Sequence, residues 1–243
     1  MSAGSPPGRT NPDGPALVLE ASTLAVGVAL VGPGGEPWGQ VVAAPDARGT
    51  ALLASAAAEL LASRSLRASD LLGVIVGTGP GSYTGTRAAI ALARALVFAA
   101  GVRIVGVPSV AGAALGELRR RPDVDRVIVL IDARRGEVYR ADYERAPISG
   151  AGTGGADSAS ACILREVRAP CLVTGADATP EQVPGISVLR EPHPDAYDVA
   201  AVGRERLLSG GDSPGAVVPL YLKRSHAEIV FDERVGSQGL GGG

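Results

Sequence analysis

Cysteine and histidine, the residues that most often build disulfide frameworks and metal sites, are scarce in this chain. Its two cysteines, Cys162 and Cys171, are separated by eight residues, and no CxxC pair exists. This usage fits a reduced, cytoplasmic compartment. The two histidines, His193 and His226, lie 33 positions apart, so they cannot form the metal-binding pair that an HxxxH helix places on one face. We therefore expect no metal and no other cofactor.

Long apolar runs and an excess of one charge are also absent. No stretch of about 18 apolar residues occurs, and residues 2–15 have no apolar signal core, so neither a membrane span nor this route of secretion is expected. The formal net charge of −2 argues against a chain that binds nucleic acid by itself, because such proteins are rich in Lys and Arg. Residues 2–15 and 236–243 are rich in Gly, Pro and Ser and are predicted to be disordered.

What the chain does contain is a soluble, globular composition and one glycine-rich segment. Its 243 residues are 46% hydrophobic and 20% charged, enough for one large or two modest cores. The segment GTGPGSYTGTRAAIALARAL, residues 77–96, follows an apolar strand at 71–76 and opens a helix predicted over 86–100, with Gly101 as the residue after its end. The exposed backbone N–H groups of such a turn either hold a phosphate or let another chain approach closely.

The common phosphate-binding motifs do not fit this turn. Walker A requires Lys after its last Gly, and here Gly85 is followed by Thr86 and Arg87. The dinucleotide fingerprint requires Gly or Ala where Ser82 stands. A tight strand-to-helix turn capped by Ser82 or Thr84 remains. No GxSxG elbow supports a serine peptidase either.

Hydrophobic periodicity predicts an α/β fold. Three strands come first and helices then alternate with strands, in the order βββαβαβα, which implies a mixed sheet whose later strands run parallel to the first. The predicted strands are 17–22, 24–31, 38–43, 71–76 and 103–107, and the predicted helices are 50–64, 86–100 and 109–121.

A second unit begins like the first. The strand at 127–132 ends in Asp132 as the first strand ends in Glu20, and a turn and a returning strand follow. Paired acids at equivalent strand ends suit a cleft between two lobes. The cleft candidates are Glu20, Ser22, Asp132, Arg134 and Glu137. The second unit is poorer, with a loop at 149–161, a short strand at 171–174 and one helix at 195–209. The predicted organisation is an extension 1–15, a first lobe 16–122, a smaller lobe 123–230 and a tail 231–243.

Five segments resemble the signature segments of the TsaB (YeaZ) family, over residues 17–228. They are LVLEASTLAVGVALV, GTGPGSYTGTRAAIALARAL, VGVPSV, LIDARRGEVYRADY and PLYLKRSHAE. The resemblance implies an actin-like, sugar-kinase and Hsp70 ATPase fold with two ribonuclease-H-like lobes, the second degenerate. It also implies a noncatalytic partner of the TsaD transferase and the TsaE ATPase in synthesis of N6-threonylcarbamoyladenosine in tRNA. A homodimer is expected when the chain is alone, and tRNA contact only through the complex.

Two other functions stay open from the sequence. One is an autonomous ATPase or kinase of the same superfamily, and the other is a glycoprotease-like peptidase, a name that the family carries in some descriptions. This chain has Glu20 where many members have Asp, and Arg48-Gly49-Thr50 where many have a His. Both departures weaken a nucleotide role for the first lobe.

Partner docking is predicted on the two Ala-rich helices. The helix at 86–100 is apolar on nearly every face except those of Arg87 and Arg94, and the helix at 50–64 is also Ala-rich. Either these helices, with Ala54 and Ala91, form a docking patch, or both are core helices. The glycine loop is expected to shape the docking helix rather than to hold phosphate. Its residues are Gly79, Pro80, Gly81, Ser82, Tyr83, Thr84 and Gly85.

Overall fold

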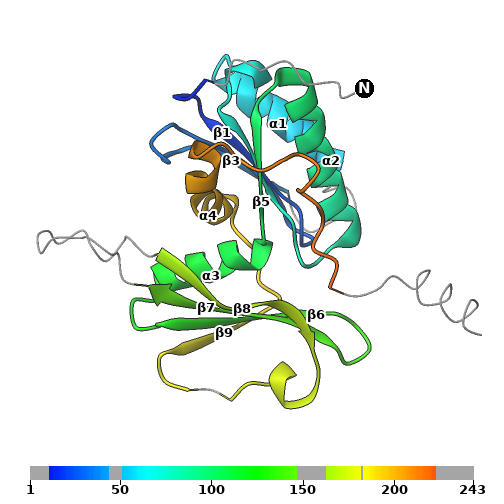
Figure 1. Ribbon diagram of the computed structural model, residues 1–243, viewed down its shortest axis with the longest axis vertical. Helices are drawn as coiled ribbons and strands as arrows, with labels where there is room; N and C mark the ends of the chain where they lie inside the picture. The colour runs from blue at the N-terminus through cyan, green and yellow to red at the C-terminus, as the bar shows by residue number, and fades with distance from the viewer. Residues whose placement is uncertain (1–10, 44–50, 147–162, 182, 223–243) are drawn as a thin grey trace, which may run out of the picture.

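The computed structural model describes residues 11–43, 51–146, 163–181 and 183–222, and within them two β-sheets are stacked along the long axis (Figure 1). The predicted loop at 149–161, the tail at 231–243 and His226 lie outside these residues. None of the helices in the described ranges has the length and apolar character needed to cross a membrane.

The first sheet has five strands in the order β3-β2-β1-β4-β5. Strands β1 and β2 and strands β2 and β3 pair antiparallel, whereas β4 runs parallel to both β1 and β5. The predicted βββαβαβα order and the parallel later strands are therefore confirmed. The bounds are β1 (Ala16–Glu20), β2 (Val26–Val31), β3 (Pro37–Ala43), α1 (Leu52–Ser63), β4 (Gly73–Gly77), α2 (Tyr83–Ala100), β5 (Arg103–Val107) and α3 (Ser109–Arg120).

The second sheet repeats the start of the first. Its order is β8-β7-β6-β9, and β6 pairs antiparallel with β7 and parallel with β9, as β1 does with β2 and β4. No strand of the described chain corresponds to β5 in this sheet, in agreement with the predicted degenerate lobe. The bounds are β6 (Arg126–Asp132), β7 (Val138–Ala146), β8 (Ile163–Val173), β9 (Ile186–Arg190) and α4 (Ala196–Leu208).

Strands β8 and β9 differ from the sequence prediction. Only a short strand at 171–174 is expected in this region, but β8 extends over eleven residues, Ile163–Val173. It is an edge strand that contains charged residues and Pro170. Such residues protect sheet edges from aggregation, but in a sequence they indicate a loop rather than a strand. Strand β9 is not predicted at all.

The helices cover the sheets in a crossed arrangement. Helices α1 and α2 pack on one face of the first sheet, and α4 packs on its opposite face, with Val199 and Leu207 against Val18 and Ile75. Helix α3 packs on the second sheet, where Leu118 joins Val127 and Tyr143. The helix predicted at 195–209 forms, but it covers the first sheet rather than the lobe to which the sequence assigns it. Each sheet is thus covered by a helix from the other half of the chain (Figure 1).

Candidate functional site

The glycine loop between β4 and α2 lies tightly against the end of β1. A Cβ atom at Gly81 would overlap the carbonyl oxygen of Ser22, and one at Gly85 would overlap that of Ala21. Gly81 also has φ of +152°, which side chains rarely adopt. At these positions the glycines thus admit the close approach of a segment of the same chain, Ala21–Ser22, and not of another chain.

Most N–H groups of this loop already have partners within the protein. Thr78 N donates to Val107 O, Gly79 N to the Ser109 hydroxyl, and Ser82 N to Ser22 O. Ser82 caps α2, because its hydroxyl accepts from Gly85 N at 3.2 Å. Helix α2 consequently begins at Tyr83, three residues before the predicted start. A phosphate cradle requires several N–H groups that have no other partner. In this loop, five N–H groups donate to atoms of the protein itself, those of residues 78, 79, 82, 85 and 86.

Glu20 is buried beneath this loop instead of lining a cleft. Its side chain is 0% exposed, and its Oε1 accepts from Ser22 N at 2.7 Å. Burial raises the pKa of the Glu20 carboxyl, although the nearby Ser22 hydroxyl and N–H and the Ser109 hydroxyl act to lower it. Gly77 makes room for this carboxyl, because a Cβ there would overlap Glu20 Oε2.

The predicted interlobe cleft exists as a cavity of about 560 Å³. Ser22, Asp132 and Arg134 line it, whereas Glu20 and Glu137 do not. The Asp132 carboxylate accepts from Arg134 N at 2.8 Å and lies 3.3 Å from the Arg134 guanidinium.

Two further residues of this cleft are missed by the sequence reasoning. Glu191 Oε1 accepts a hydrogen bond from Asp132 N. His193 Nδ1 lies 3.0 Å from the Thr23 hydroxyl, and this contact joins the segment before α4 to the β1–β2 turn. The only signal in the sequence is the proline-flanked stretch EPHPD. Within the described ranges, no group of three or more His, Cys, Asp or Glu is placed to hold a metal ion.

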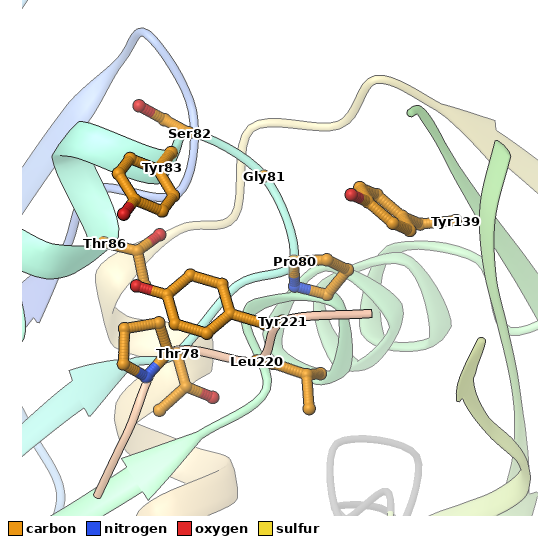
Figure 2. Close-up of a pocket in the computed structure, with 10 residues that line it drawn as sticks. Thr78, Pro80, Gly81, Ser82, Tyr83, Thr86, Tyr139, Leu220 and Tyr221 are labelled. Carbon is orange, nitrogen blue, oxygen red and sulfur yellow. The ribbon is translucent and has the colours of Figure 1, made fainter. Parts of the chain in front are cut away.

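A second cavity, of about 240 Å³, also adjoins the glycine loop (Figure 2). The rings of Tyr83 and Tyr221 contact each other, with centroids 5.6 Å apart. The Arg87 guanidinium lies 5.0 Å from the centroid of the Tyr83 ring and donates to the Tyr83 hydroxyl. Tyr221 lies 138 positions after Tyr83 in the sequence, so no local pattern could reveal this pair.

Tyr221 belongs to a C-terminal strap, residues 212–222, that crosses the edge of the first sheet. Asp212 N donates to Ile104 O and Leu220 N donates to Thr78 O, both at hydrogen-bond distance. Arg94 on α2 donates to the carbonyl oxygens of Gly215 and Val217, at 3.3 and 2.7 Å. Arg94, a candidate for partner contact from the sequence, therefore fastens the strap.

The Ala-rich helices place small side chains on the surface. Ala54 on α1 and Ala91 on α2 are exposed, while other alanines of the same helices are buried against the first sheet. Two larger apolar residues of these helices are also exposed, Leu52 at 44% and Phe98 at 93%. We call this surface the α1–α2 face; its members are Leu52, Ala54, Ala58, Ala62, Ala91, Ala95, Phe98 and Ala99.

Comparison with known sequences finds relatives in tRNA modification. A family model described as TsaD, tRNA N6-adenosine threonylcarbamoyltransferase, matches residues 49–153. The tRNA threonylcarbamoyladenosine biosynthesis protein TsaB of Escherichia coli K12 is 37% identical over 87 residues, which are 36% of this chain and 37% of that protein. The chain thus spans little more than a third of that relative. An uncharacterized protein of Mycobacterium tuberculosis H37Rv is 32% identical over 180 residues, 69% of this chain and 72% of the relative.

Two solved structures share the fold. YeaZ from Pseudomonas aeruginosa superposes with a TM-score of 0.68 at 22% identity, covering 86% of this chain and 100% of that one. A second structure, of an uncharacterized protein with similarity to peptidase YeaZ from the same organism, gives 0.70 at 22% identity with the same coverage. Together with the match to the TsaD family model, these neighbours confirm the predicted actin-like ATPase-type fold.

Proposed function

Because the chain belongs to the TsaB (YeaZ) family, we propose that it acts in the biosynthesis of threonylcarbamoyladenosine in tRNA as a noncatalytic subunit. In this role it docks a TsaD-like transferase and, with it, a TsaE-like ATPase. The TsaB relatives carry this pathway in their names. The partners and the scaffold role are our inference.

The observation that carries the proposal is the α1–α2 face. Apart from Leu52 and Phe98, its residues are exposed alanines, and such small residues let the backbone of another helix approach closely. Phe98, with 93% of its surface exposed, supplies the kind of aromatic anchor that dominates interface energy.

The match to the TsaD model adds a reason for the choice of partner. The matched span, residues 49–153, contains both helices of this face. A partner with a related helix pair could pack against it with approximate two-fold symmetry. A second copy of this chain would use the same face, so the homodimer and the complex with the TsaD-like partner compete.

A double substitution tests this docking. Ala54→Glu with Ala91→Glu places two carboxylates on the face, and burying an unpaired charge costs several kcal/mol. We expect a folded protein that no longer co-purifies with the TsaD-like partner at micromolar concentration. Ala169→Glu with Ala176→Glu, at exposed positions elsewhere, is the matched control and should bind normally. Undiminished binding of the first variant would remove the α1–α2 face from the proposal.

An assay on the pure chain separates the scaffold from the two alternatives. We expect neither ATP nor peptide turnover above a heat-inactivated control, because the loop N–H groups are engaged and Glu20 is buried. Steady ATP hydrolysis that is lost on Glu20→Gln would favour an autonomous ATPase. Cleavage of casein would favour the peptidase.

A further inference from the structure

The cavity beside Tyr221 has a lining without charge. Its ten residues are three tyrosines, two threonines, two prolines, a serine, a leucine and a glycine. Figure 2 shows the Tyr221 ring below Tyr83 and beside Pro80, with Tyr139 on the other side of the loop and its hydroxyl toward the Pro80–Gly81 stretch. Flat aromatic walls of this kind favour a planar ring that stacks on an aromatic face.

The cavity also contains a polar group that lacks a partner. Thr86 is 3% exposed and its side chain lines the cavity. Throughout the part of the chain that the structure describes, no group is placed to hydrogen-bond with Thr86 Oγ1. An unpaired buried hydroxyl destabilises a protein, so a ligand with donors or acceptors on its edge would satisfy it.

The neighbouring cleft supplies a different chemistry. The two cavities share Gly81, Ser82 and Tyr139, and the larger one contains the carboxylates of Asp132 and Glu191. Carboxylates accept hydrogen bonds from the hydroxyls of a ribose, whereas they repel phosphate. The cleft is also lined by Arg134, whose guanidinium is paired with Asp132 at 3.3 Å. The aromatic compartment, about 240 Å³, is smaller than the roughly 300–1,000 Å³ of pockets that enclose a whole drug-sized ligand, so it suits a base alone.

We propose that these two compartments bind a purine nucleoside unit, with the base beside Tyr221 and the ribose toward Asp132 and Glu191, and without a phosphate chain. A purine is favoured because its two rings give the larger stacking area. The engaged N–H groups of the glycine loop leave little to hold phosphate. This site is distinct from the α1–α2 face and does not depend on partner docking.

Calorimetric titration of the full chain tests the proposal and its source of ligand. The probes are adenosine, guanosine, a hexamer of oligoadenylate without a terminal phosphate, and ATP. Saturable binding of a free nucleoside, with ATP weaker, supports a free ligand; binding of the hexamer alone supports a base of RNA. Absence of saturable binding by all the purine probes, or ATP binding as tightly as adenosine, overturns the proposal.

Thr86→Val gives a signature that a merely structural residue would not. Loss of one hydrogen bond should weaken nucleoside binding about tenfold, while the thermal midpoint of the unliganded protein stays equal or rises. Thr84→Val, exposed on the same turn and outside the cavity lining, should change neither quantity. Unchanged affinity in Thr86→Val overturns the proposal. Tyr221→Leu, on the half-exposed strap, provides a second variant, with an expected loss above about tenfold from stacking.

Discussion

Glu20 and Thr86 are buried polar residues close to the glycine loop, and the sequence singles out only Glu20. Glu20 is the last residue of β1 and Thr86 lies in the first turn of α2, so their proximity to the loop follows from the motif. Their burial does not, because it depends on how closely the loop packs on Ala21 and Ser22. The sequence therefore suggests a cleft acid at position 20, whereas the carboxyl is covered on all sides.

Substitution of Glu20 should change how stability depends on pH. The folded-state pKa of Glu20 is raised by burial, so the folded protein binds a proton more tightly than the unfolded chain does. The contribution of this group to stability is complete below the unfolded pKa, near 4.5, and is lost as pH rises through the raised folded value. Glu20→Gln should therefore raise the free energy of unfolding at pH 7 relative to the wild type, and the difference should shrink at pH 4.

Denaturant unfolding at the two pH values measures this effect. Glu59→Gln, an exposed acid on α1, is the control and should alter neither curve. A Glu20→Gln protein that is less stable than the wild type at pH 7 would mean that the carboxylate is stabilised by its serine neighbours more than burial destabilises it.

At the scale of elements, the strands and helices with strong periodicity or caps agree with prediction. Helix α2 is capped at its start by Ser82 and at its end by Gly101, whose φ of +69° is left-handed. The failures have a common physical cause, because β8, β9 and the position of α4 depend on contacts between distant segments. The pairing of β7 with β8 and the packing of α4 on β1 leave no local signal that one sequence could reveal.

The close contact of the glycine loop with Ser22 predicts the effect of Gly81→Val. A valine there meets the Ser22 carbonyl and requires an unfavourable φ, so the loop and the start of α2 should shift. We expect a loss of about 1–3 kcal/mol in stability, typical of overpacking. The yield of the complex with the TsaD-like and TsaE-like partners, and of modified tRNA, should fall, while neither protein shows a high-affinity ATP site in calorimetry.

Gly215→Val is the control for this experiment. Gly215 lies on the strap, and a Cβ atom at this position would meet no atom closer than 4.0 Å, so the complex yield of this variant should match that of the wild type. Micromolar ATP binding by the wild type that disappears in Gly81→Val would instead identify the loop as a nucleotide cradle.

At the scale of the whole molecule, the crossed helices make the two halves depend on each other. The sequence predicts a first lobe ending at 122 and a second beginning at 123, since the strand pattern restarts there. Helix α4 nevertheless covers the first sheet and α3 covers the second. A chain cut between these lobes would expose the face of Val18, Val31 and Ile75 in one piece and that of Val127 and Tyr143 in the other.

We therefore expect that fragments 1–122 and 123–243 do not fold separately but regain structure when they are mixed. The intact chain should unfold in a single transition whose calorimetric and van't Hoff enthalpies agree. Circular dichroism and thermal melts of each fragment and of the equimolar mixture measure this. Val199→Asp in the second fragment puts a carboxylate at a position that is 0% exposed and should block reassembly, whereas the exposed change Ala176→Asp should not. A cooperative melt of either fragment alone would show that its sheet is stable without the helix from the other half, and the predicted boundary at 122 would then divide two independent folding units.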